Sequence, residues 1–217
     1  MPSVVLLQRD HEASPRLRSL IDATPRFHVV GELHTTAQAR RLMQHNPPDV
    51  LVTDLRVQDG SVYPFLQELR QGARVPSPHV LVTLLSRDDV VLLEALRGGA
   101  DGYWIHACEP NALIGALEQV ARGESPMTPT IARQVLAHFQ HPALPVCDTM
   151  TEAFNSLVLT RSEEQVLHWV AQGYLVDEIA QQWRASVHSV GREIRRVYQK
   201  LRFDLQATAL SLQQQAA

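Results

Sequence analysis

The segment near the C-terminus carries a dense set of side chains that can bind phosphate groups or base edges. Between Arg184 and Arg202 there are six Lys or Arg residues and one acidic residue, Glu193, which gives a local net charge of +5 (6 − 1). The whole chain has a net charge of −3, so the cluster is a local departure from the average. Because guanidinium groups neutralise phosphates and form bidentate hydrogen bonds with guanine, the cluster indicates nucleic-acid binding.

The apolar pattern places these cations on one helix. At about 100° per residue, one stripe is apolar and the opposite face is polar. A charged helical face is usually only a solvated surface, but this helix would follow a helix at 176–183 and a short turn in which Ser186 can act as the N-cap. The sequence therefore predicts a helix-turn-helix unit whose polar face touches DNA. The stripe is Val190, Ile194, Val197 and Leu201, and the opposite face is His188, Arg192, Arg195 and Gln199.

A second group of polar side chains follows the apolar runs of the first half. Arg9 and Asp10 come after VVLL, Asp54 ends DVLVTD, and His106 follows GYWI. In parallel sheets the carboxyl ends of the strands meet at one edge, so we expect these groups to lie together. Carboxylates there could hold a hard cation such as Mg²⁺, and a guanidinium could instead neutralise them.

Short β-branched runs alternate with amphipathic stretches through the first 120 residues, which predicts a parallel sheet covered by helices on both faces. From residue 124 to 156 four prolines interrupt one helical stretch, which is typical of a linker. We therefore expect a domain at 1–123, a linker at 124–156 with one helix at 131–139, and a helical domain at 157–217. The expected strands are 4–7, 27–32, 49–54, 79–85 and 102–105, and the expected helices are 14–23, 36–45, 62–71, 88–97, 110–122, 161–172, 176–183 and 187–202.

No apolar run approaches the ~18 residues of a membrane span, and the N-terminus does not read as a signal peptide. We therefore expect a cytoplasmic protein with no membrane partner. The sequence shows no nucleophile–base pair and no phosphate-binding loop, so we do not expect an enzyme.

Both halves resemble one family. The C-terminal pattern L-T-x-x-E-x-x-V-L-x-x-V-A-x-G, then E-I-A, S-x-x-S-V and V-Y-x-K-L, is similar to the LuxR-type helix-turn-helix. The segments PDVLVTDL around Asp54, GGADGYW at 98–104 and ARGE at 121–124 resemble a receiver domain. The chain is thus similar to NarL/FixJ-type response regulators, which are transcription factors phosphorylated on an aspartate by a histidine kinase.

The resemblance implies a flavodoxin-like, doubly wound sheet in the order 2-1-3-4-5, a phosphoacceptor at Asp54, double-stranded DNA as a partner and a homodimer. A final helix near 206–213 would mediate dimerisation. A second dimer face would be formed by the fourth and fifth helices, although their leucines at 92, 93, 96, 113 and 117 are equally explained as core. The DNA-binding positions would be His188, Ser189, Gly191, Arg192, Arg195, Arg196 and Lys200.

The sequence departs from the family on both sites. Gly191 replaces a usual lysine, and Glu193, which often is histidine, can pair with Arg196. In the receiver pocket, Arg9 stands at the first acidic position, Leu84 at the hydroxyl position and His106 at the lysine position, with Thr83 turned to the other face. Only Asp10 and Asp54 remain as candidate metal ligands.

We therefore hypothesise that Arg9 pairs with Asp54, Asp10 or both, and that the receiver works without phosphorylation, with no cofactor. Three alternatives stay open. Arg9 could point to solvent while Asp54 still accepts phosphate, which would require Mg²⁺. The chain could be a conventional phosphorylation-switched regulator. It could also be an anti-activator that binds a partner regulator and touches DNA weakly, for which Gly191 and Glu193 are the supporting features.

Overall fold

The computed structural model describes residues 1–71, 77–85, 89–106, 110–140 and 158–215. The chain folds into two compact units, Met1–Gly123 and Glu124–Ala217. Within the described residues, no helix combines the length and the apolar character that crossing a bilayer requires.

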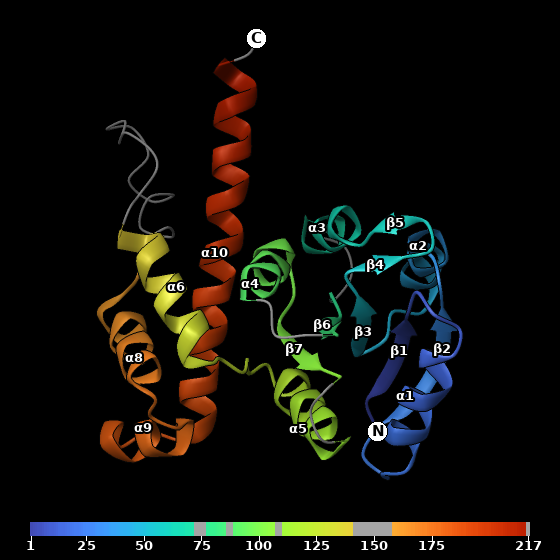
Figure 1. Ribbon diagram of the computed structural model, residues 1–217, viewed down its shortest axis with the longest axis horizontal. Helices are drawn as coiled ribbons and strands as arrows, with labels where there is room; N and C mark the ends of the chain where they lie inside the picture. The colour runs from blue at the N-terminus through green and yellow to red at the C-terminus, as the bar shows by residue number, and fades with distance from the viewer. Residues whose placement is uncertain (72–76, 86–88, 107–109, 141–157, 216–217) are drawn as a thin grey trace. The chain divides into compact units, whose positions relative to one another are not determined.

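The N-terminal unit is built on a sheet of five parallel strands in the order β2-β1-β3-β6-β7 (Figure 1). Counted without the short hairpin, this order is the 2-1-3-4-5 that the resemblance implied, so the fold prediction is confirmed. The hairpin was not predicted, and it follows β3 directly. The strands are β1 (Ser3–Leu7), β2 (His28–Leu33), β3 (Val50–Asp54), β6 (His79–Leu84) and β7 (Gly102–Ile105), and the hairpin is β4 (Arg56–Val57) with β5 (Gly60–Ser61).

Five helices cover this sheet, and each begins and ends within one residue of its predicted range. Helices α1 and α5 pack on one face, where Leu17 and Leu117 join a buried cluster with Val4, Val52 and Trp104 of the strands. Figure 1 shows α2, α3 and α4 on the other side of the sheet. The helices are α1 (Ala13–Asp22), α2 (Thr36–His45), α3 (Tyr63–Gln71), α4 (Asp89–Gly98) and α5 (Pro110–Ala121).

The leucines of α4 and α5 that could have formed a dimer face are mostly core residues. Leu92, Leu96, Leu113 and Leu117 are 0–3% exposed, and only Leu93 is partly exposed. The burial of one stripe of each amphipathic helix therefore accounts for them.

The C-terminal unit consists of four described helices, in which α6 packs against α8 and α10 contacts both α8 and α9 (Figure 1). Ile131, Ala132 and Val135 of α6 are completely buried, so the helix predicted inside the linker is part of this unit's core. Residues 141–156 of the predicted linker lie outside the described part of the chain. The helices are α6 (Pro129–Gln140), α8 (Arg161–Gln172), α9 (Val176–Trp183) and α10 (Val187–Gln215).

Helix α10 is continuous over 29 residues. The sequence predicted a helix ending near Arg202 and a separate one at 206–213, and that break is wrong. No glycine or proline interrupts the chain between 202 and 215, so helix propagation meets no breaker there. The side chains from 203 onward lie outside the described part, so the dimerisation role of 206–213 stays a prediction.

The predicted caps of this unit are present. Thr160 and Glu163 form a capping box before α8, and Gly173 ends the helix with φ 97°. The Ser186 hydroxyl accepts the Ser189 N–H at 3.1 Å and so caps α10. Arg184, between α9 and α10, is the one non-glycine residue with positive φ in the described chain.

A buried ion pair ties strands β6 and β7 to helix α3. The Asp101 carboxylate is fully buried, accepts the Val80 N–H at 2.8 Å and pairs with Arg70 at 2.7 Å. Arg70 also donates to the Gly99 carbonyl oxygen at 2.8 Å. Breaking such a pair leaves a charged group with little solvent, which is strongly destabilising.

We therefore expect Asp101→Ala to lower the free energy of unfolding of the N-terminal unit by about 3–5 kcal/mol. The exposed pair of Arg40 and Glu68 supplies the control, because Glu68→Ala should cost less than about 1 kcal/mol. Urea unfolding followed by tryptophan fluorescence and circular dichroism measures both variants. Equal losses of unfolding free energy in the two variants would show that the buried pair stabilises the unit no more than the exposed pair does.

Candidate functional site

The first candidate site is a pocket of about 430 Å³ at the carboxyl edge of the sheet. All five positions predicted for this site line it. They come from the ends of four strands or from the loops that follow, which is where ligands bind in open α/β sheets. The lining includes Gln8, Arg9, Asp10, Asp54, Arg56, Thr83, Leu84 and His106.

The carboxylate of Asp54 is held by neutral donors. Its Oδ1 accepts the Thr83 hydroxyl at 2.5 Å, and its Oδ2 accepts the backbone N–H of Arg9 at 2.9 Å. The side-chain amide of Gln8, which is completely buried, lies 3.0 Å from Oδ1 and donates to it when its nitrogen faces the carboxylate. Hydrogen bonds to both oxygens stabilise the ionised form of a carboxylate without a cation.

The predicted ion pair of Arg9 is wrong in this structure. No salt bridge within the described residues joins its guanidinium to Asp54 or Asp10, and its side chain is exposed. The chain turns after β1 so that the main chain of Arg9, and not its side chain, meets Asp54. The partial positive charge that approaches the carboxylate therefore belongs to a backbone N–H and not to a guanidinium.

The hydroxyl position was also assigned one residue too late. In the register of the two neighbouring strands, Asp54 of β3 lies beside Thr83 of β6, and in parallel strands such neighbours point to the same face. Thr83 therefore supplies the hydroxyl that the sequence analysis considered lost, and Leu84 is 6% exposed at the pocket wall. One of the three expected losses is thus reversed.

The departures at Arg9 and His106 remain. Asp10, the retained acid beside Arg9, has an exposed side chain whose Oδ1 accepts the Glu12 N–H at 2.9 Å, so it caps its own turn. His106 is half-buried, and burial lowers the pKa of its imidazole, although the charge of Asp54 acts in the opposite direction. A lowered pKa keeps His106 neutral at neutral pH, where lysine would be charged.

The residues present do not fit a tightly held magnesium ion. Arg9 stands where the family has a carboxylate, and the two remaining acids already accept N–H or O–H donors. The described residues contain no group of three or more His, Cys, Asp or Glu side chains placed to hold a metal. Mg²⁺ binding would require rearrangement of these hydrogen bonds, because the ion needs oxygen ligands in a near-ideal octahedron.

Gln8 and Thr83 are the two functional side chains that the sequence analysis missed. Gln8 directly follows β1, which ends at Leu7, and a buried amide must find partners. A polar residue at the end of a buried strand was therefore the available signal. The role of Thr83 follows from the register between β3 and β6, which cannot be read from the sequence alone.

The second candidate site is the exposed face of α10. Val190, Ile194, Val197 and Leu201 are completely buried, as predicted from their spacing. His188, Arg192 and Arg196 are exposed, and Ser189 and Arg195 are partly exposed. The predicted polar face is therefore turned away from the core at these positions.

Carboxylates of the same unit take up part of this positive charge. Arg196 pairs with Glu193, as the three-residue spacing predicted, and Nδ1 of His188 forms a hydrogen bond with Oε1 of Glu124. Arg192 takes part in no ion pair among the described residues, and its side chain is exposed. Arg192 is thus the residue of the set whose guanidinium is most available to a ligand.

Two of the predicted DNA-binding positions do not face solvent. Gly191 is buried, and a Cβ built there would lie 2.9 Å from the Cβ of Glu124. The Lys200 ammonium lies 2.7 Å from Glu163 Oε2 and 2.7 Å from the carbonyl oxygen of Val158. The side chains of Lys200 and Glu163 are only 14% and 3% exposed, so the charge of Lys200 is compensated inside the unit, and its role in DNA binding stays a prediction.

Lys200→Met should therefore destabilise the C-terminal unit by about 3 kcal/mol, because the Glu163 carboxylate would stay buried without its cation. Arg192→Met removes the same charge from an exposed position and should cost no more than about 0.5 kcal/mol. Chemical unfolding of the two variants measures the difference. Similar costs would show that Lys200 is not part of the core.

The chain was compared with known proteins. Residues 157–211 match the family described as bacterial regulatory proteins, luxR family. The nitrate/nitrite response regulator protein NarL of Escherichia coli is 28% identical over 209 residues, which cover 93% of this chain and 90% of NarL. NarP of the same organism is 29% identical over 219 residues, covering 100% of this chain and 97% of NarP.

Solved structures agree in fold. A LuxR-family two-component response regulator from Aurantimonas has a TM-score of 0.56 at 24% identity and covers 65% of this chain and 99% of its own. The RcsB response regulator of Salmonella typhimurium has a TM-score of 0.52 at 20% identity, covering 92% and 91%. The chain is therefore related over nearly its whole length to response regulators of the NarL type, and its C-terminal unit carries a LuxR-family domain.

Proposed function

We propose that this protein is a transcription regulator that binds double-stranded DNA as a homodimer through α10, and that its N-terminal unit works without phosphorylation. The observation that carries the DNA-binding part is the basic, exposed face of a capped helix whose other face is core. The observation that carries the second part is Asp54, whose carboxylate is satisfied by neutral donors.

The printed titles of the solved relatives support the DNA-binding part. One structure holds RcsB bound to a promoter, and another holds two RcsB dimers bound to DNA. In the family that the chain resembles, the positions of Gly191, Arg192 and Arg195 face the major groove. Arg192 is exposed in this chain, and a guanidinium can contact phosphate or guanine there.

The chemistry of phosphoryl transfer supports the second part. The charge that develops on the phosphoryl oxygens must be offset by metal ions or fixed cations. In this pocket one metal-ligand position is Arg9 and the lysine position is a neutral imidazole. Asp54 keeps its hydroxyl partner, but the pocket has a guanidinium at one metal-ligand position and no lysine to supply the permanent counter-charge.

A conventional phosphorylation switch is the second candidate function, and one observation favours it. Thr83 stands 2.5 Å from Asp54, at the place where the family uses a hydroxyl to contact the phosphoryl group. The hydrogen bond between Thr83 and Asp54 is the arrangement that a phosphorylatable receiver uses. The two candidates differ in whether Asp54 can be modified.

Incubation of the full chain with acetyl phosphate and Mg²⁺ should leave the mass of the wild type unchanged. The double variant Arg9→Asp/His106→Lys restores the carboxylate and the ammonium and should gain one phosphoryl group, because the metal and the counter-charge are then present. Adding Asp54→Asn to the double variant should abolish the gain. Intact mass spectrometry measures these three proteins and the single variant Asp54→Asn. A phosphoryl group that is present on the wild type and absent from Asp54→Asn would contradict the proposal and favour the conventional switch.

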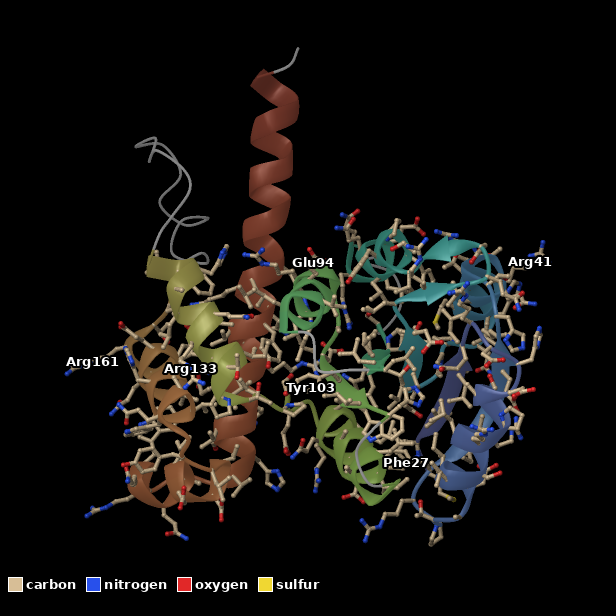
Figure 2. All side chains as sticks on the ribbon, viewed as in Figure 1. Phe27, Arg41, Glu94, Tyr103, Arg133 and Arg161 are labelled. Carbon is tan, nitrogen blue, oxygen red and sulfur yellow. The ribbon has the colours of Figure 1, made fainter. Side chains whose placement is uncertain are left out.

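The DNA-binding part is tested with a duplex selected from a random-sequence pool by the full-length wild type. Arg192→Ala should weaken binding by about tenfold and reduce the salt dependence by about one counterion, since a guanidinium contact is worth about 1–3 kcal/mol. The matched control is Arg41→Ala, which removes the same charge from α2, where the side chain points outward (Figure 2). Fluorescence anisotropy at several salt concentrations measures the affinities. If the Arg192 and Arg41 variants bind alike, α10 is not the DNA-binding element.

A further inference from the structure

The pocket at the carboxyl edge of the sheet has an apolar wall in addition to its polar groups. Leu55, Leu84, Leu85 and Val91 all line it. Leu85 is 85% exposed and Val91 is partly exposed, so these two side chains meet solvent as well as protein. The pocket volume of about 430 Å³ lies in the range of about 300–1,000 Å³ that is typical of small-molecule sites. The pocket can therefore hold a molecule with an apolar body.

The carboxylates and the cations of the pocket differ in how far their hydrogen-bonding capacity is used. Asp54 accepts donors on both oxygens, and Asp10 accepts the Glu12 N–H. The guanidinium groups of Arg9 and Arg56, in contrast, are exposed and form no ion pair within the described part of the chain. The charged side chains that remain free to bind a ligand are therefore cationic donors, and their strongest partners are anionic oxygens.

His106 adds a neutral polar group to the same pocket. It is half-buried, and burial lowers the pKa of its imidazole. Its ring centroid lies 4.7 Å from that of Trp104, so a large buried side chain restricts its orientation. A neutral imidazole can donate one N–H to an anionic oxygen without bringing a second charge into the site.

The charges of the pocket favour a monoanion over a phosphate. Asp10 and Asp54 are negative, and they repel a doubly charged ligand more strongly than a singly charged one. A planar guanidinium matches the two oxygens of a carboxylate. The apolar wall contributes affinity only when the ligand carries hydrocarbon that leaves water.

We propose that this pocket binds a small organic carboxylate with an apolar body. Arg9 and Arg56 hold its charge, and Leu84, Leu85 and Val91 pack against its hydrocarbon part. The inference rests on the proposal that the N-terminal unit works without phosphorylation, because the carboxylate takes the place of the phosphoryl group beside Asp54. Its binding needs neither Mg²⁺ nor a kinase.

Octanoate and indole-3-acetate are the probes, because each joins one carboxylate to a hydrocarbon body. At least one of them should bind the full chain with a dissociation constant of about 1 mM or below. Its neutral amide, octanamide or indole-3-acetamide, should bind at least about tenfold more weakly, since the charge-assisted hydrogen bonds are lost. Two-dimensional NMR of the ¹⁵N-labelled chain measures the affinities, and the shifted amides should include those of Arg9 and Thr83.

Three substitutions at exposed side chains test the contacts. Arg9→Gln and Arg56→Gln should each weaken binding of the acid by about tenfold, because each removes one charged partner. Leu85→Ser should weaken it by about threefold, because part of the apolar contact is lost. The matched control is Arg41→Gln, which removes the same charge from α2 and should leave the affinity unchanged. Circular dichroism checks that all four variants are folded.

Four results would overturn the proposal. Absence of binding by both acids would show that the pocket has no carboxylate site. Equal affinities of an acid and its amide would show that the guanidinium groups make no contact. Inorganic phosphate that binds more tightly than both acids would identify a simple anion site without an apolar part. Equal losses in Arg56→Gln and Arg41→Gln would reduce the effect to one of net charge.

The acetyl phosphate experiment and the octanoate titration separate the two levels of proposal. If the wild type gains no phosphoryl group and binds neither acid, the unit works without phosphorylation and only the carboxylate site is wrong. If the wild type gains a phosphoryl group on Asp54, the proposed function is wrong, and so is the inference that a carboxylate takes the place of that group.

Discussion

The buried or half-buried carboxylate is the constraint on which both units depend, because a charge removed from water must be compensated where it stands. At Asp54 the compensation comes from a hydroxyl, an amide and a backbone N–H. At Asp101 it comes from a guanidinium and a backbone N–H. In the C-terminal unit, Glu163 has Lys200, and Glu124 has His188. The group that compensates each carboxylate determines which charges at that site remain available to bind a ligand.

The basic cluster near the C-terminus shows this effect most clearly. Six Lys or Arg residues between 184 and 202 suggest a strongly positive surface. In the folded unit, Lys200 is turned into the core and Arg196 is paired with Glu193. The positive charge offered to a ligand is therefore smaller than the count of cations, and Arg192 is one of the exposed residues that still offer it. A local charge sum measures composition, whereas partners in the fold determine the charge that is available.

The elements of the fold could be predicted from the sequence to a large extent. Apolar periodicity and caps are local, so α2, α8 and α9 were predicted with the bounds they have, and the strand order followed from the family resemblance. The direction of the Arg9 side chain depends on how the chain turns after β1, and the partner of Asp54 depends on the register of β3 with β6. The partners of Lys200 and Gly191 are 37 and 67 residues away in the chain (200 − 163 and 191 − 124). Spacing along one helix contains no information on such contacts.

The unbroken course of α10 has a mechanical consequence. Its first turns bear the residues that face outward beside Gly191, and the same backbone runs on to Gln215, a length on the order of 40 Å at about 1.5 Å per residue. A helix transmits rotation about its axis and displacement along it, whereas a loop would absorb both. Any contact that fixes the far end of this rod also fixes the azimuth of its first turns. In a symmetric dimer joined through the far ends, the two helices would therefore fix the orientation of their first turns relative to each other. Both first turns could then contact DNA only where the two half-sites have a matching spacing along the duplex.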